Sequence, residues 1–386
     1  MLIPVKLKEL GDIITGNTPS KKEISYWDSK DICFVKPDSI SEQGISIVKN
    51  TTEYLSEKAS SKARIVTKDA VFVTCIGTIG KIGLAAEGRY AFNQQINVVV
   101  PNTKVLPKYL AYALLSSKKR LEDIANAPVV PIINKTQFGE FSIKIEDNTL
   151  LQKDIVNILD KVVGIIDFRR KELQCLDNLV KARFVEMFGA LNNTSYETLP
   201  LGDICEFIKD GTHQTPTYTE DKVRGYKFLS SKDVTSQKIS WSNIKYIPES
   251  LHNELYSKLA PRRGDILLAK NGTTGVAAVV DTDEVFDIYV SLALLRPKVG
   301  YNSRYLWAVI NSNDTKMQFN ANLKGIGVPN LHLGEIKKAK VIVPPLEQQE
   351  KFAVFLEQID KSKVAIQKSL AETQLLFDKL MQDYFG

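Results

Sequence analysis

The chain has 386 residues, of which 44% are apolar and 25% charged, as is typical of a globular protein with two or three domains. Its net charge of +6 suits a polyanionic partner. No apolar run reaches the roughly 18–20 residues that a membrane span needs, and the first residues carry no secretory signal. We therefore expect a cytoplasmic protein with no membrane partner.

The sulfur and imidazole side chains exclude a zinc cluster. Only three histidines are present, and no two of the four cysteines have CxxC spacing. We expect all four cysteines to act as small buried apolar residues: Cys33, Cys75, Cys175 and Cys205.

Residues 1–146 are expected to form a first α+β domain. Its strand candidates are Ala70–Thr74, Lys81–Ala85 and Ile96–Val100. A helix is predicted near Pro107–Arg120. Glycine-bearing turns interrupt the strands, and 20 basic residues stand against 15 acidic ones.

Residues 147–190 are predicted to form one long helix. The segment Asp147-Asn148-Thr149 offers an N-cap, with Gln152 at capping-box spacing from Thr149, and Gly189 offers a C-cap. Steps of three and four residues give a seam with eight apolar residues of ten: Ile155, Leu159, Val162, Ile166, Arg169, Leu173, Leu176, Val180, Arg183 and Met187. Basic and acidic residues are balanced here, at 7 each.

Residues 191–343 repeat the first domain, and residues 344–386 repeat the helix. The offset between matching motifs drifts only from 191 to 198 residues, so the gene looks duplicated. The matching motifs are Leu10–Ile13 with Leu201–Ile204, Gly16–Pro19 with Gly211–Pro216, and Gly77–Gly80 with Gly272–Gly275. The second strand candidates are Asp265–Ala269, Val276–Val280 and Ser291–Leu295, with a helix near Ser303–Phe319.

The second seam is the first displaced by 197 residues, from Phe352 to Tyr384, and again has eight apolar residues of ten. About 39 residues at 1.5 Å per residue give a helix of roughly 58 Å. Two such helices can pair antiparallel as a spacer. The second domain has 19 basic and 16 acidic residues, whereas the second helix has 5 and 7, so the excess of positive charge lies in the two domains.

Motifs of common enzymes are absent from the sequence. Gly77–Ile82 lacks the spacing of a P-loop, and Gly325–Gly327 lacks the third glycine of a dinucleotide fingerprint. Pro344 and Pro345 lack the flanking Asn or Asp and aromatic residue with which adenine methyltransferases hold a flipped base. A large duplicated chain without these motifs is best explained as a binding scaffold.

The domain openings at Leu7–Ile13 and Leu199–Ile204, the Gly…Thr-Pro turns, and the helix entry Val343–Gln349 resemble the specificity subunits of type I restriction-modification enzymes. The first helix entry, Asn148–Gln152, departs by lacking the double proline. The resemblance covers essentially the whole chain. It implies two target-recognition domains with twisted β-sheets and small helices, joined by two long antiparallel coiled-coil helices with pseudo-twofold symmetry.

The resemblance also implies a role and partners. Each domain would read half of a bipartite, asymmetric double-stranded DNA site, and the helices would fix the gap. Two modification subunits, which carry S-adenosylmethionine, would dock on the chain, and restriction subunits would join them. The chain itself would be non-catalytic and hold no cofactor or metal.

Specific DNA reading needs positive charge for phosphates and polar groups for base edges. Candidate phosphate contacts are Lys21, Lys22, Lys36, Lys81, Lys232, Lys270 and Lys324. Candidate base readers are Asn17, Thr18, Asn93, Gln94, Gln95, Thr212, His213, Gln214, Thr215, Asn271 and Thr273, and Thr78 lies in a matching turn. Glycines that would let the backbone approach phosphates are Gly77, Gly80, Gly272 and Gly275.

Two other hypotheses remain open from the residues alone. The chain could be a non-catalytic coiled-coil interaction scaffold whose domains do not read DNA. It could also be a free-standing DNA-binding regulator without methyltransferase partners. Neighbouring methyltransferase and ATPase-nuclease genes would favour the specificity subunit over both.

Overall fold

The computed structural model describes residues 2–125, 130–323 and 330–386. It divides into two compact units, the first formed by Met1–Arg170 with Lys368–Gly386 and the second by Lys171–Gln367. No helix in the described ranges is long and apolar enough to cross a membrane.

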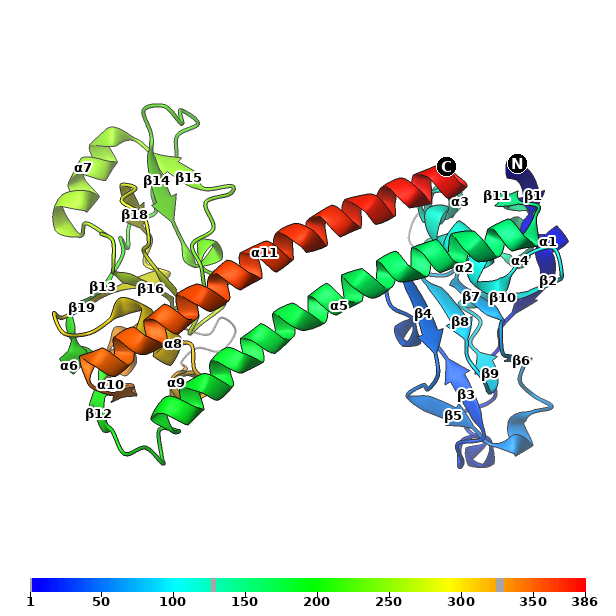
Figure 1. Ribbon diagram of the computed structural model, residues 1–386, viewed down its shortest axis with the longest axis horizontal. Helices are drawn as coiled ribbons and strands as arrows, with labels where there is room; N and C mark the ends of the chain where they lie inside the picture. Colours follow the sequence, from blue (N-terminus) through cyan, green and yellow to red (C-terminus); the bar gives the residue numbers. More distant parts are fainter. Residues whose placement is uncertain (1, 126–129, 324–329) are drawn as a thin grey trace. The chain divides into compact units, whose positions relative to one another are not determined.

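The first unit consists of three sheets, short helices and parts of two long helices (Figure 1). Its strands are β1 Leu2–Lys6, β2 Gly11–Thr15, β3 Ile32–Val35, β4 Ile45–Val48, β5 Glu53–Leu55, β6 Ile65–Thr67, β7 Val71–Thr74, β8 Ile82–Ala85, β9 Arg89–Phe92, β10 Ile96–Pro101 and β11 Ser142–Glu146. Its helices are α1 Leu7–Leu10, α2 Pro107–Ser116, α3 Lys118–Ile124, α4 Lys135–Glu140 and the start of α5 Thr149–Phe188, with short 3-10 turns at Ile24–Tyr26, Pro37–Ser39 and Glu57–Ala59.

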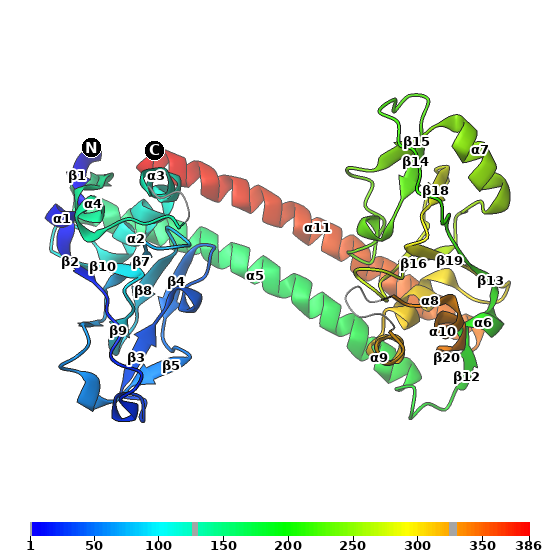
Figure 2. The same ribbon diagram turned by 180° about the vertical axis from the view of Figure 1, so that it is seen from behind.

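The central sheet of the first unit has the order β2-β10-β7-β8-β4 and packs on α2 and the long helices. Val71 and Val73 of β7 share one buried cluster with Tyr109 of α2 and Leu159 of α5. A second sheet, β5-β3-β9-β6, lies at the end of the unit away from α5 (Figures 1 and 2). The loops that join the two sheets therefore leave the central sheet at the edge away from the helices.

The second unit repeats this plan. Its strands are β12 Glu197–Pro200, β13 Cys205–Asp210, β14 Tyr226–Leu229, β15 Lys245–Ile247, β16 Ile266–Ala269, β17 Ala277–Val279, β18 Phe286–Ile288, β19 Leu292–Pro297 and β20 Lys340–Val343. Its helices are α6 Leu201–Ile204, α7 Glu249–Lys258, α8 Ser303–Ile310, α9 Asn313–Ala321, α10 Leu333–Lys338 and the start of α11 Leu346–Phe385, with a 3-10 turn at Ser231–Asp233.

The central sheets of the two units match strand for strand. The order β13-β19-β16-β17 in the second unit corresponds to β2-β10-β7-β8 in the first, and every one of these pairings is antiparallel. The first unit adds β4, which pairs parallel with β8. The second sheet of the second unit has the order β15-β14-β18.

Each helix that we expected after the central strands is two helices. The first breaks at Ser117, which is buried and whose backbone N–H still bonds the carbonyls of Ala113 and Leu114. The second breaks at Asn311 and Ser312. The Ser312 hydroxyl accepts from the Thr315 N–H and caps α9, because a serine side chain can satisfy a free N–H at a helix start.

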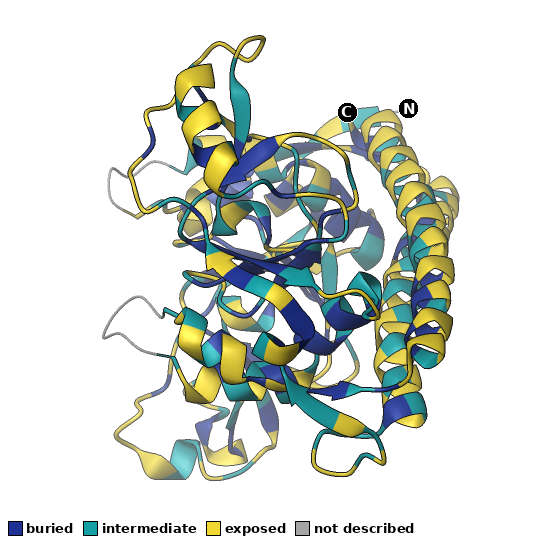
Figure 3. Cartoon of the chain, turned by 90° about the vertical axis from the view of Figure 1, so that its left-hand side faces the viewer, coloured by how far each residue is buried: buried dark blue, intermediate teal, exposed yellow. Residues whose placement is uncertain are grey.

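The two long helices are antiparallel, as the cores of the two units show separately. In the first unit, Leu159 near the start of α5 shares a cluster with Met381 and Phe385 near the end of α11. In the second, Phe188 at the end of α5 packs edge-to-face on Phe352 near the start of α11, with ring centroids 5.4 Å apart. Seam positions are mostly buried or half-buried, and the other positions mostly exposed (Figure 3).

The ends of α5 differ partly from expectation. Gly189 follows the helix with φ of 77°, and its N–H bonds the Val185 carbonyl, so the predicted C-cap is confirmed. Within the predicted segment Asp147-Asn148-Thr149, the capping residue is Asn148, whose side chain accepts from the Leu150 N–H at 2.9 Å. The predicted seam residue Arg183 is exposed.

Gln152 does not close a capping box, because its buried amide holds the loop before α2. Its Oε1 accepts from the Leu106 N–H at 2.8 Å, and its Nε2 donates to the Glu146 carbonyl at 2.7 Å. Gln349, 197 residues later, does the same in the second unit, where its Oε1 accepts from the Asn302 N–H at 2.9 Å. The repeat thus extends to a buried polar clamp at each helix entry.

Candidate DNA-reading surfaces

Loops that are far apart in the sequence converge at one edge of the central sheet in the first unit. The Gly16 N–H bonds the Ile96 carbonyl at 3.1 Å, and the Asn17 N–H bonds the Phe92 carbonyl at 2.9 Å. The Cys75 N–H bonds the Gln95 carbonyl at 2.7 Å. These bonds join residues 16–19, 75–80 and 93–95, and we name the three loops together the first reading surface.

The second unit brings the matching loops together by the same bonds. The Gly211 N–H bonds the Leu292 carbonyl at 3.2 Å, and the Lys270 N–H bonds the Ser291 carbonyl at 2.9 Å. We name residues 211–216, 270–275 and 289–291 the second reading surface. A Cβ on Gly211 would lie 2.2 Å from the Ile288 carbonyl oxygen, so glycine is required where the backbones cross.

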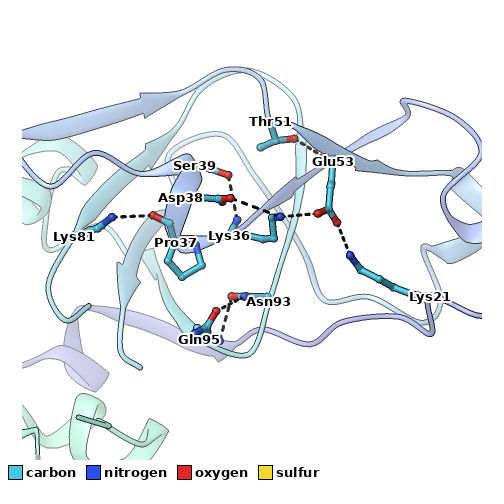
Figure 4. Close-up of polar contacts among 10 residues, drawn as sticks. All are labelled: Lys21, Lys36, Pro37, Asp38, Ser39, Thr51, Glu53, Lys81, Asn93 and Gln95. Atoms are coloured by element: carbon cyan, nitrogen blue, oxygen red, sulfur yellow. Dashed lines mark hydrogen bonds and ion pairs between the residues drawn. The ribbon is translucent and has the colours of Figure 1, made fainter. Parts of the chain in front are cut away.

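Most of the first unit's candidate lysines are already paired (Figure 4). Lys36 Nζ lies 2.5 Å from Glu53 Oε1, and Lys21 Nζ lies 3.1 Å from Glu53 Oε2. Glu53 raises the pKa of Lys36 through their hydrogen bond. Lys81 is largely covered and donates to the Pro37 carbonyl at 3.3 Å. Lys22 is exposed and has no ion pair with a described residue, so it is the best placed of the four for a phosphate.

In the second unit, burial argues against Lys270 as a phosphate contact. Its side chain is only 6% exposed and pairs with Asp210. Lys232 is exposed and has no ion pair with any residue that the structure describes. Lys324 lies outside the described residues.

All four amide candidates of the first unit have hydrogen-bond partners within the chain. Asn17 bridges two backbone groups, because its Nδ2 donates to the Lys62 carbonyl at 2.7 Å and its Oδ1 accepts from the Arg64 N–H at 2.9 Å. Asn93 is buried and donates to Gln95 Oε1 at 2.8 Å (Figure 4). Thr18 and Gln94 are exposed, and the Thr18 hydroxyl donates to Gln94 Oε1 at 2.9 Å. Thr18, Thr78 and Gln94 are therefore the candidate readers of this surface that a ligand can reach.

The candidates of the second reading surface are more open. His213, Gln214, Thr215 and Thr273 are exposed, and Thr212 and Asn271 are half-buried. His213 Nε2 lies 3.6 Å from Asp210 Oδ2, so the Asp210 carboxylate lies between this imidazole and the buried Lys270. The second surface therefore carries an imidazole, whereas the candidate readers of the first are hydroxyls and amides.

The four candidate glycines form two groups that differ in the space around them. Gly77 and Gly272 have φ of 78° and 74° and open space where a Cβ would point, so their backbones are accessible. A Cβ on Gly80 would lie 2.8 Å from Lys118 Cγ, and one on Gly275 would lie 3.2 Å from Phe319 Cδ2. The latter two are therefore explained by packing against a helix rather than by a phosphate.

The sequence reasoning missed two further segments beside these turns. Ile132 forms an isolated antiparallel bridge with Ile76, and Asn330 forms one with Asn271. A signal was present, because Pro131–Asn134 and Pro329–His332 repeat as Pro-x-(Ile/Leu)-(Asn/His) at an offset of 198 residues. Residues 289–291 were also missed, since they share no residue type with 93–95.

The thiols are not part of the reading surfaces' chemistry. Burial raises the pKa of Cys75 and of Cys205 to about 12 each, which keeps both thiols protonated. The expectation that all four cysteines are buried is wrong for Cys175, which is exposed on α5, and Cys33 is only half-buried. Among the described residues, no group of three His, Cys, Asp or Glu side chains could hold a metal ion. What the surfaces offer is hydrogen bonding and charge.

Comparison with known proteins matches this duplicated arrangement. The family model of the Type I restriction modification DNA specificity domain matches residues 4–178 and again residues 193–374. The specificity subunit of the type I restriction enzyme MjaIX of Methanocaldococcus jannaschii is 21% identical over 416 residues, covering 97% of this chain and 90% of that protein. The MjaVIII specificity subunit of the same organism is 24% identical over 337 residues, covering 80% and 78%.

Solved structures share the fold. The S subunit of a type I restriction-modification system from M. genitalium superposes with a TM-score of 0.56 at 16% identity, covering 100% of this chain and 96% of that one. A chain from a structure on complex assembly and conformational transition of the type I system gives 0.59 at 17% identity, covering 99% and 96%. Because one family model matches both halves, the chain belongs to the DNA specificity subunits of type I restriction-modification systems and is itself non-catalytic.

Proposed function

We propose that this subunit reads a bipartite, asymmetric site on double-stranded DNA, one half with each reading surface. The observation that carries the proposal is the convergence, in both units, of matching loops that leave hydroxyl, amide or imidazole groups exposed beside accessible glycine turns. Such groups are those that recognise base edges and phosphates. Because the exposed groups differ between the surfaces, the two half-sites differ as well.

We further propose that two modification subunits, which carry S-adenosylmethionine and the methylating site, dock on the long helices. Restriction subunits complete the cleaving complex in the cytoplasm. Support for docking comes from apolar side chains that α5 leaves uncovered: Ile158, Ile165 and Phe168, the last 59% exposed. A spacing of seven and three residues places them on one face of the helix. Phe168→Asp should weaken co-purification of the modification subunit, with Gln174→Asp, at an exposed position on another face of α5, as the control.

The long helices are proposed to set the gap between half-sites. Helix α5 is continuous over 40 residues, which is about 60 Å at 1.5 Å per residue. A continuous helix is stiff enough to hold a fixed separation, whereas a flexible linker would accept several gaps.

The decisive experiment maps adenine methylation across the genome with and without the gene. One bipartite motif should lose methylation when the gene is absent. Purified complex then tests the phosphate contacts: Lys22→Ala and Lys232→Ala should each reduce the salt dependence of binding by about one ion, whereas Lys153→Ala on α5 should not. The interaction-scaffold alternative predicts no motif at all, and the free regulator predicts DNA binding without any change in methylation.

A further inference from the structure

Beside each glycine turn of the reading surfaces, the residue before the first glycine pairs with a residue of another segment across an isolated β-bridge. In the first unit the Gly77 N–H bonds the Pro131 carbonyl at 3.0 Å, and the Ile133 N–H bonds the Cys75 carbonyl at 2.8 Å. These bonds flank Ile76 and Ile132, which face each other as a non-hydrogen-bonded antiparallel pair. Side chains of such a pair lie on the same face and unusually close together, so Ile76 and Ile132 act as one apolar contact surface.

The second unit has the same pairing with different chemistry. The Leu331 N–H bonds the Lys270 carbonyl at 3.0 Å, and Asn271 faces Asn330 across the bridge. Two carboxamides thus stand where the first unit has two isoleucines. Both turns lead directly into an exposed threonine, Thr78 or Thr273, so the pair lies at the root of a loop that reaches outward.

The asparagine pair has unused hydrogen-bonding capacity. Oδ1 of Asn271 and Oδ1 of Asn330 are both covered, and neither accepts a hydrogen bond from the described residues. Covered acceptors without a donor are unfavourable, because they have lost water and gained nothing in return. Both residues are half-buried, so rotation of either amide can turn its oxygen from this covered position toward a ligand beside the reading loop.

The apolar pair is partly open to solvent. Ile132 remains 40% exposed although its partner Ile76 is half-buried. A single exposed isoleucine is ordinary. Here, however, it occupies the position at which the other unit has an amide whose covered oxygen lacks a donor. The same structural position therefore carries contrasting chemistry in the two half-site readers.

We propose that residues 76 and 132 in the first unit, and residues 271 and 330 in the second, determine base identity in their half-sites. The isoleucine pair contacts the 5-methyl group of a thymine, and the asparagine pair binds the N6 amino group and N7 of an adenine. These are the major-groove features that apolar and carboxamide side chains distinguish. The inference rests on the proposed reading of DNA and assigns one base in each half-site to a pair of residues.

The first test replaces the asparagine pair in the full complex. Asn271→Ile with Asn330→Ile, made in cells that carry the modification subunit, should relax the second half-site at one adenine, with a loss of about 5- to 150-fold in preference there. The first half-site should not change. Asn253→Ile, on the exposed face of α7, is the matched control. If the double variant does not fold, Asn330→Ser, which keeps polarity but not the bidentate geometry, gives the same readout.

The second test uses DNA in which uracil replaces each thymine of the first half-site in turn. Uracil lacks only the 5-methyl group, so one position should weaken binding of the wild-type complex, and Ile76→Asn with Ile132→Asn should abolish that difference. An unchanged methylation motif in the asparagine variant, or no sensitivity to any uracil, would overturn the inference while leaving the proposed function intact. A genome with no motif that depends on this gene would instead overturn the proposed function.

Discussion

The central sheets of the two units have the same strand order but different buried charges. In the second unit Arg296 on β19 forms a two-point ion pair with Asp265, with Nε–Oδ1 and Nη2–Oδ2 distances of 2.8 and 2.7 Å. At the matching strand positions the first unit has Ala70 and Val100. Likewise, Asp210 and Lys270 form a second pair where the first unit has the neutral Thr15 and Cys75.

This difference separates the features on which the fold of a unit depends from those that it can lack. Both central sheets form, although the first unit has neither of these two buried ion pairs. The shared features are the backbone ladder, the apolar strands and the helix clamp by Gln152 or Gln349. Burying paired charges adds little net stability, since desolvation offsets attraction, but it makes each partner dependent on the other. The framework is thus constant, while the charged side chains that pair across it have diverged.

The largest effect expected from this comparison is an exchange of whole domains. Replacing residues 1–146 with the matching segment of a related specificity subunit should change one half of the methylated site and leave the other half and the gap unchanged. The reason is that each reading surface is built from loops of a single unit. Sequencing methylated sites in cells with the hybrid measures this. A change in both halves would contradict independent reading.

Helices α5 and α11 are both 40 residues long, and an insertion tests whether they set the gap. Four residues added after Leu173 lengthen α5 by about 6 Å and turn it by about 400°, nearly preserving the seam. The gap should then grow by about one or two base pairs, at about 3.4 Å per pair, with both half-sites unchanged.

Two inserted residues provide the contrast. They turn the seam through about 200°, which moves Leu176 and Val180 to the opposite face of the helix, and assembly should fail. The methylation maps of both strains serve as the measurement. An unchanged gap with four residues would exclude the helices as the spacer even if DNA reading survived.

Features with short sequence periods were predictable. The spacing of three and four residues between apolar side chains from Ile155 onward predicted the long helix, because α5 buries one face along its length. The apolar run at residues 70–74 predicted β7, because that strand is buried on both sides. The repeat then supplied the second unit. The split at Ser312 was not predicted, because a capping serine within an amphipathic stretch looks like an ordinary exposed helix position.

The candidate site was less predictable because its details are long-range. Nothing near Lys36 in the sequence indicates that its ammonium group pairs with the Glu53 carboxylate. Lys270 likewise pairs with Asp210, which lies sixty residues away in the sequence. Asn17 looked like a base reader but bonds residues 62 and 64. Loop composition therefore located the surfaces, whereas only the three-dimensional pairing separates free groups from engaged ones.

Breaking a buried ion pair should cost the second unit more than any single surface change. Asp265→Ala leaves the Arg296 guanidinium buried without its carboxylate, and we expect a loss of about 3–5 kcal/mol in the free energy of unfolding. Asp265→Ala with Arg296→Val copies Ala70 and Val100 of the first unit and should recover most of that loss. Denaturant unfolding of the full chain measures both. Equal destabilisation by the single and double variants would show that the pair itself is not the cause.

The smallest expected effect concerns Glu140, which has no counterpart in the second unit, where the matching α10 position is Lys338. Hydrogen bonds from Lys6 and then Lys8 lower the pKa of Glu140 from its ordinary 4.5 to about 2. A lowered folded-state pKa means that this cluster stabilises the first unit fully above about pH 4.5. The contribution is lost as the pH falls towards 2, because protonation removes the charge that the lysines bind. Since all three side chains are largely exposed, salt should screen the effect.

The measurement compares thermal unfolding of the wild type and Glu140→Gln between pH 6 and pH 2. The wild type should unfold at slightly higher temperature above pH 4.5, the difference should vanish near pH 2, and 1 M salt should reduce it at every pH. Glu335→Gln in the second unit is the control, because the Glu335 carboxylate pairs with the neighbouring Lys338 on its own helix, at 3.3 Å, and with no lysine of another element among the described residues. A difference that grows as the pH falls would mean that folding raises the pKa of Glu140 instead of lowering it. The lysines would then not stabilise the Glu140 carboxylate.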